Sequence, residues 1–203
     1  MSKVRIGVLC SGGGTNFQAI LNAQHAGMIP HGEVVLVISD HRDAFVLERA
    51  AKYGVETAVF DRKEIPDRAA REEAILSCLK AKGIEFVVFA GFMTILSEKF
   101  VRAYENRIIN VHPALLPSFG GKGMYGLHVH EAVLAKGVKL TGATVHYVTE
   151  ECDGGPIIAQ RAVEVKEGDT PEILQKRVMR EAEWVILPEA VETVAKKIIG
   201  EDK

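Results

Sequence analysis

The chain is poor in cysteine, has no surplus of positive charge and contains no long apolar run. Its three cysteines, Cys10, Cys78 and Cys152, are odd in number and far apart, which argues against a disulfide framework or a structural zinc site. The formal net charge is −2 and 26% of the residues are charged, so nothing indicates a surface for nucleic acid or membranes. These absences favour chemistry on small molecules.

No segment approaches the roughly 20 apolar residues that a membrane-spanning helix needs. The apolar run that follows the first five residues is too short for the core of a signal peptide, so we expect a cytoplasmic protein. At 203 residues and 47% hydrophobic composition, the chain can bury one sizeable α/β core. We therefore expect a single domain over residues 1–203, without internal repeats or linkers.

Apolar runs alternate with amphipathic stretches in the first half of the sequence. Strands are predicted at residues 4–10, 33–39, 56–60 and 86–90, and helices at 16–26, 44–53 and 68–82. The strands are apolar almost throughout, as buried parallel strands require. Gly27, Gly54 and Gly83 stand where the three helices should end. This pattern indicates a Rossmann-like, doubly wound α/β fold with a mostly parallel sheet.

The second half of the sequence has a different pattern. A strand ends at His112, and the Gly-rich residues 118–126 then predict a functional loop or lid. A short helix is predicted at residues 128–135, and strands at 142–148 and 156–165 that can pair as an antiparallel extension of the sheet. Pro171 opens the last helix, and Pro188 should interrupt or restart it.

A glycine-rich turn joins the first strand to the first helix. It reads Ser11-Gly12-Gly13-Gly14-Thr15-Asn16, and the free N–H groups at such a helix start can bind a phosphate. The alternative is a tight turn that binds nothing. Phe17 stands where a dinucleotide fingerprint needs its third glycine, although Asp40 could hold a ribose. A P-loop is excluded because no Gly-Lys-Ser/Thr follows, so a lone phosphate fits better.

The strongest candidate for catalysis is the element Asn110-Val111-His112-Pro113 together with Asp153. Because side chains alternate along a strand, Asn110 and His112 should project from the same face. A carboxylate near an imidazole raises its pKa, so Asp153 would make His112 an acid that can stabilise an oxyanion. Taken singly, His112 could be a structural histidine and Asp153 an ordinary turn residue.

Three competing interpretations concern other residues. Cys152 could be a nucleophile paired with His112, although no thiol-enzyme signature surrounds it. His128, His130 and His146 could hold a metal ion, although their spacing is not a specific ligand pattern. The apolar residues 92–96 follow a strand end, where ligands collect, and either line a pocket or belong to the core.

Taken in order along the chain, these motifs resemble those of the folate-dependent phosphoribosylglycinamide formyltransferases. The resemblance covers nearly the whole sequence and is most specific at the Asn-x-His-Pro element and the later Asp-Gly-Gly-Pro element. The segments that carry it are residues 11–16, 90–93, 109–113, 115–117, 142–146 and 153–156. Four positions depart from the usual family residue: Gly13 for Asn, Thr94 for Arg, Ala114 for Ser and Trp184 for His.

The resemblance implies transfer of a formyl group from 10-formyltetrahydrofolate to the amine of 5-phosphoribosylglycinamide in purine biosynthesis, without a metal. It implies small-molecule partners and allows a homodimer. It makes Asn110, His112 and Asp153 catalytic, with the substrate phosphate and ribose held by Gly14, Thr15, Asn16 and Glu183. The implied folate pocket consists of Arg68, Met93, Thr94, Ile95, Leu96, Asn110, Thr149, Glu150, Glu151, Cys152 and Asp153.

Other functions use the same first half. A sugar-nucleotide formyltransferase shares the chemistry and also needs a phosphate loop. A dinucleotide-binding oxidoreductase or a nucleotide sensor would bind nicotinamide or adenine nucleotides rather than folate. Methionyl-tRNA formyltransferases and formyltetrahydrofolate hydrolases carry a further domain, for which this chain has no room.

Overall fold

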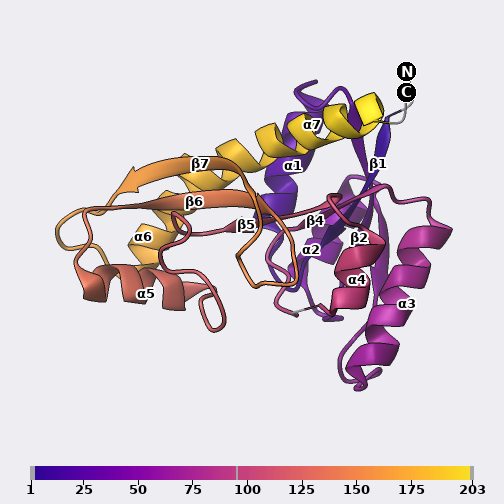
Figure 1. Ribbon diagram of the computed structural model, residues 1–203, viewed down its shortest axis with the longest axis horizontal. Coiled ribbons are helices and arrows are strands. Elements are labelled where there is room, and N and C mark those ends of the chain that lie inside the picture. Colours follow the sequence, from indigo (N-terminus) through magenta and orange to yellow (C-terminus); the bar gives the residue numbers. More distant parts are fainter. Residues whose placement is uncertain (1–2, 95, 202–203) are drawn as a thin grey trace.

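A computed structural model describes residues 3–94 and 96–201. In this part of the chain one seven-stranded sheet has the order β3-β2-β1-β4-β5-β6-β7 (Figure 1). The first five strands are parallel, and the last two pairings, β5 with β6 and β6 with β7, are antiparallel, which confirms the predicted fold class. The strands are β1 Val4–Leu9, β2 Gly32–Ser39, β3 Glu56–Val59, β4 Phe86–Phe89, β5 Ile108–His112, β6 Leu140–Tyr147 and β7 Ile157–Glu164.

Helices cover both faces of the sheet, which explains why its central strands are apolar on both sides. One face packs on α1 Thr15–His25, α2 Phe45–Lys52, α5 Leu127–Lys136, α6 Pro171–Val178 and α7 Trp184–Glu201. The other face packs on α3 Arg68–Ala81 and α4 Glu98–Ala103. Among the described residues, no helix is both long and apolar enough to cross a membrane.

The helix α4 was not predicted from the sequence. It has only six residues, too few for an apolar period to stand out. Its start is nevertheless marked by Ser97, whose side-chain oxygen accepts a hydrogen bond from the amide of Phe100 at 3.4 Å. The short helix forms part of the connection between β4 and β5.

The prediction that Pro188 interrupts the last helix is wrong. Helix α7 runs through Pro188, and the irregularity lies earlier, in a π-helical turn at Met179–Glu183. The hydrogen bond that Pro188 cannot donate would go to Trp184, four residues back and the first residue of α7. The lost bond therefore falls at the junction with the π turn, where helical bonding already changes register.

Strand order reverses between β1 and β4, because the chain leaves β1 toward β2 and β3 and returns to pair β4 on the other side. In open α/β sheets, ligands bind outside the carboxyl ends of the strands at such a switch point. Three segments lie at this edge of the sheet: the start of α1, which follows β1, the segment after β4, and the end of β5. Figure 1 shows the loop between β6 and β7 reaching back toward the same region.

The turn between β6 and β7 fits only glycine at position 155. A Cβ atom there would lie 1.8 Å from the carbonyl oxygen of Tyr147, so the backbone itself would have to move. We expect Gly155→Ala to lower the free energy of unfolding by about 2–4 kcal/mol in urea titrations. As a control, Gly200→Ala in α7 meets no neighbouring atom and should raise stability by up to about 1 kcal/mol. Equal effects of the two substitutions would contradict this account of the turn.

Candidate active site

A cavity of about 580 Å³ opens at the carboxyl edge of the parallel strands. Its wall brings together most of the residues that the sequence singled out, from all parts of the chain. The predicted site residues that line it are Asn16, Met93, Thr94, Leu96, Asn110, His112, Thr149, Glu150, Glu151, Cys152, Asp153 and Glu183. Residues 92–96 are therefore a pocket wall as far as they are described.

Three of the described predicted residues, Gly14, Thr15 and Arg68, are not among the lining residues. Ile95 lies outside the described residues. Gly14 and Thr15 form the start of α1 behind Asn16, and Gly14 has a φ of 69°, which suits glycine. Arg68 instead donates from Nε to Glu72 at 2.8 Å, and the other oxygen of Glu72 accepts from the amide of Ser97 at 3.2 Å. The structure thus connects Arg68 to the cap of α4 rather than to the cavity.

Antiparallel pairing of β5 with β6 sets the centre of the site. Asn110 lies opposite His146, and His112 lies opposite Thr144. The Asn110 amide donates from Nδ2 to Nε2 of His146 at 3.3 Å, and Nδ1 of His146 donates to the Tyr147 carbonyl at 2.9 Å. The Tyr147 carbonyl can only accept, so Nδ1 of His146 carries a proton, while Nε2 faces both the Asn110 amide and, at 3.5 Å, a carboxylate oxygen of Asp153.

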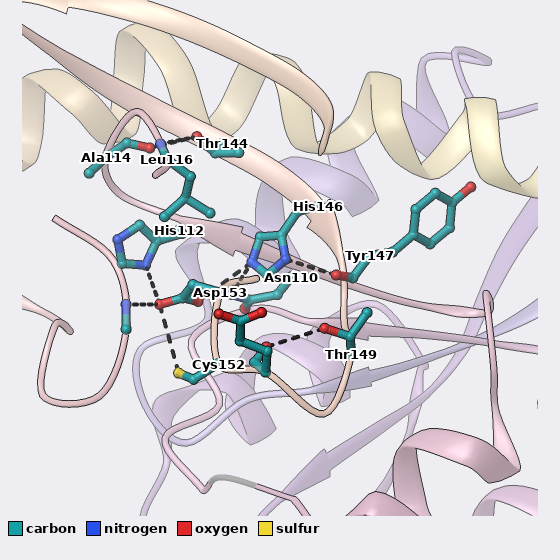
Figure 2. Close-up of polar contacts among 12 residues, drawn as sticks. Asn110, His112, Ala114, Leu116, Thr144, His146, Tyr147, Thr149, Cys152 and Asp153 are labelled. Carbon is teal, nitrogen blue, oxygen red and sulfur yellow. Dashed lines mark hydrogen bonds and ion pairs between the residues drawn. The ribbon is translucent and has the colours of Figure 1, made fainter. Parts of the chain in front are cut away.

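Thr144 fixes the turn that follows His112. Its hydroxyl donates to the Ala114 carbonyl at 2.7 Å and accepts from the Leu116 amide at 3.0 Å (Figure 2). Gln160 of β7 adds a third hydrogen bond, to the same oxygen, at 3.0 Å. The hydrogen bonds to Ala114 and Leu116 are buried, so they set the direction in which the chain leaves His112.

The Asp153 carboxylate lies between the two imidazoles, as Figure 2 shows. One oxygen lies 3.5 Å from Nδ1 of His112 and accepts from the Gly121 amide at 2.9 Å, and the other lies 3.5 Å from Nε2 of His146. Burial raises the pKa of Asp153, but the contacts with His146, the Gly121 amide and His112 outweigh it and leave the pKa below its usual value. Asp153 is therefore an ionised carboxylate at neutral pH.

His112 differs from the prediction in its charge. Burial lowers its pKa; the nearby Asp153 charge and the Phe119 carbonyl, 2.8 Å from Nε2, raise the pKa, and His146 lowers it further. The net result is a pKa below 6.5, which contradicts the expectation that Asp153 keeps His112 charged. Asp153 acts in the predicted direction, but desolvation of the buried ring is stronger.

Asn16 and Glu183 connect the glycine-rich turn at residues 11–16 to the π turn. The Asn16 amide donates from Nδ2 to Glu183 at 2.6 Å, and both side chains are buried. Burial raises the pKa of Glu183 to about 7, against a lowering by the Asn16 hydrogen bond. The other Asn16 atom, Oδ1, has no partner among the described residues, so it is available to a donor on a ligand.

Asp40 is not available to hold a ribose. It is fully buried, and its Oδ2 atom accepts the Thr94 hydroxyl at 2.8 Å with Arg62 at 3.6 Å. Thr94 is one of the four departures from the family pattern. Its hydroxyl is bound by Asp40, the residue after β2, which fixes the Thr94 side chain in the pocket wall. The dinucleotide interpretation loses the acidic residue on which it depended.

The structure gives little support to the two other competing interpretations, a Cys152 nucleophile and a histidine metal site. Burial, together with the Asp153 charge and hydrogen bond, raises the pKa of the Cys152 thiol, which disfavours the nucleophilic thiolate. His128 is exposed and lies 3.2 Å from Glu131, whereas His130 is completely buried. In residues 3–94 and 96–201, no group of three or more His, Cys, Asp or Glu side chains is placed to hold a metal ion.

Sequence reasoning missed several parts of the site. His146 was considered only as a metal ligand, because its contact with Asn110 depends on a strand register that the sequence does not show. The available signal was the spacing of Thr144 and His146, which places two polar side chains on one strand face. The Phe119 carbonyl and the Gly121 amide are backbone groups and carry no residue-type signal.

Comparisons with known proteins agree on one family. Residues 4–191 match the family model described as formyl transferase. The chain is 38% identical to the phosphoribosylglycinamide formyltransferase of Haemophilus influenzae, over 91% of this chain and 84% of that protein. It is 41% identical to the chloroplastic enzyme of that name from Arabidopsis thaliana, of which it spans 61%, with 88% of this chain covered.

The chain spans 19% of the Gallus gallus trifunctional purine biosynthetic protein adenosine-3, with 43% identity over 96% of this chain. Among solved structures, it is similar to glycinamide ribonucleotide transformylase 1 from Symbiobacterium toebii, with a TM-score of 0.89 and 45% identity. That match covers 96% of this chain and 89% of the other. The structure of phosphoribosylglycinamide formyltransferase from Brucella melitensis matches with a TM-score of 0.87 and 42% identity, and the match covers 96% of both chains.

The buried Glu183 should make stability depend on pH. A carboxyl group with a higher pKa in the folded chain stabilises it fully below the usual value of 4.5, and this contribution is lost as the pH rises toward 7. Glu183→Gln keeps an acceptor for Asn16 but does not ionise. We expect this variant to be more stable than the parent at pH 8, by on the order of 3 kcal/mol, with a smaller difference at pH 5.

Urea unfolding at the two pH values measures this difference. The matched control is Glu181→Gln, which removes an exposed carboxylate from the same π turn and should change stability little at either pH. A Glu183→Gln variant that is equally destabilised at both pH values would contradict the prediction.

Proposed function

The chain belongs to the formyl transferase family, and we propose that it transfers the formyl group of 10-formyltetrahydrofolate to the amine of 5-phosphoribosylglycinamide in purine biosynthesis. The cluster of Asn110, His112, His146 and Asp153 on the cavity wall carries this proposal, because it combines a neutral donor, an imidazole and an ionised carboxylate. These are the groups that acyl transfer through a tetrahedral intermediate needs. That the chain can form a homodimer and that it is cytoplasmic stay predictions.

The two ends of the cavity suit the two substrates. At one end, Asn16 at the start of α1 and the buried Glu183 would receive the phosphate and ribose of the acceptor. At the other end, Phe89, Leu96, Val101 and Val148 give an apolar wall for a flat pterin ring, and the turn at residues 149–153 adds backbone polar groups. The reacting groups would then meet between these ends, at Asn110 and His112.

In the proposed mechanism the amine attacks the formyl carbon, so that a C–N bond forms and the carbonyl oxygen becomes an oxyanion. Asn110 donates a hydrogen bond to this oxygen, and the developing negative charge favours protonation of His112 beside it. Asp153 stabilises the imidazolium and relays the proton released by the amine to the folate nitrogen. The bond between that nitrogen and the formyl carbon then breaks, which yields the formylated acceptor and tetrahydrofolate.

Removal of either oxyanion donor should slow the reaction. Each such donor contributes about 10²–10³ in rate, so we expect Asn110→Ala and His112→Ala each to lower kcat by that factor. The assay follows consumption of 10-formyltetrahydrofolate in the presence of 5-phosphoribosylglycinamide. Asn22→Ala, at an exposed position of α1, serves as the control and should keep full activity. Near-normal turnover of both site variants would refute their assignment.

Replacement of Asp153 should change the pH dependence of the reaction as well as its rate. The Asp153 charge raises the pKa of His112, so Asp153→Asn lowers it. If the protonated ring stabilises the oxyanion, the decline of kcat on the alkaline side should begin at lower pH in the variant. The measurement is kcat against pH for both proteins. A lower kcat with an unchanged pH profile would rule out this role for Asp153.

A further inference from the structure

His130 is a buried imidazole that the mechanism above does not use. It lies in α5, is completely buried, and contributes to the wall of the active-site cavity. Neither of its ring nitrogens has a hydrogen-bond partner among the described residues. An unpartnered buried polar group costs about 1–3 kcal/mol, so a position that keeps a histidine at this cost needs an explanation.

The His130 ring is neutral at pH 7. Burial lowers the pKa of His130 to about 4, and the neighbouring His112 adds a smaller effect in the same direction. A neutral imidazole offers one N–H donor and one nitrogen acceptor. This pair matches an uncharged group that itself has a donor and an acceptor, whereas an ionised carboxylate or phosphate would leave the acceptor nitrogen unpaired.

The position of His130 places it on the acceptor side of the site. Helix α5 packs against α6, which continues into the π turn that carries Glu183. Gln175 and Met179, from α6 and the π turn, line the same cavity as His130. His130 is also close enough to His112 for the two rings to interact electrostatically. It therefore lies near both the ribose end and the reacting end of the proposed acceptor position.

One hydrogen-bonding group of the acceptor substrate has no partner among the residues proposed above to bind it. Its phosphate and ribose are assigned to the turn at residues 11–16 and to Glu183, and its amine to the catalytic cluster. Between them lies a secondary amide with one N–H donor and one carbonyl acceptor. We propose that His130 binds this amide, an inference that rests on the proposed function and adds a substrate-binding residue to it.

The test compares His130→Leu and His130→Gln with the parent and with His128→Leu as a matched control. His128 lies two residues earlier in α5, is exposed and does not line the active-site cavity. We expect His130→Leu to raise KM for 5-phosphoribosylglycinamide about tenfold and to leave KM for 10-formyltetrahydrofolate within about twofold. His130→Gln, which keeps a donor and an acceptor, should recover part of the loss, and His128→Leu should behave as the parent.

Stability gives a second readout that separates binding from a structural role. Because leucine removes the unpartnered polar atoms from the unliganded chain, His130→Leu should keep or raise the Tm while it weakens acceptor binding. An unchanged KM for the acceptor would overturn the proposal. So would a lower Tm with both KM values raised, because the ring would then have a structural partner in the unliganded chain.

Equilibrium binding of 5-phosphoribosylglycinamide without folate keeps this inference distinct from the proposed function. A parent protein that binds the acceptor but transfers no formyl group would refute the activity, and the His130→Leu variant would still report on the amide contact. A parent that does not bind the acceptor would overturn both.

Discussion

The pairing of β5 with β6 in one antiparallel register is the constraint on which the site depends. It places Asn110 opposite His146 and His112 opposite Thr144, and side chains on one strand face come within reach of each other. A slip of one residue would turn both catalytic candidates away from the cavity. The β6–β7 turn adds Asp153 to the same cluster, so a short antiparallel segment assembles an amide, two imidazoles and a carboxylate at the edge of an otherwise parallel sheet.

Much of the fold was predictable because the signals are local. Nearly continuous apolar runs predicted the buried strands to within about two residues of their ends, and the antiparallel extension followed from two runs joined by an acidic turn. Two features were not predictable. Helix α4 is shorter than the period that identifies a helix, and Pro188 is tolerated only because the hydrogen bond it lacks falls beside a π turn. Such a turn changes the hydrogen-bond register without a diagnostic residue type.

The site was predictable residue by residue, but its electrostatics were not. Motifs identified Asn110, His112 and Asp153, the family resemblance added Glu183, and the structure brings all four to one cavity. The charge of His112 depends on how far the ring is desolvated, which only packing determines, and burial outweighed the carboxylate that the sequence had suggested. The raised pKa of Glu183 has the same origin, since burial raises it more than the long-range hydrogen bond from Asn16 lowers it.

The Gly-rich loop touches the catalytic residues only through its main chain in the contacts described here. The Phe119 carbonyl meets His112, and the Gly121 amide meets Asp153. Every residue has a carbonyl, and every residue except proline has an amide hydrogen. Neither contact depends on the type of side chain, but the φ of 91° at Gly121 and the 2.4 Å between a Cβ at Gly120 and Leu116 favour glycine at both positions. Related enzymes can therefore vary the other side chains of this loop without removing either contact, as long as the backbone between the two contacts keeps this conformation.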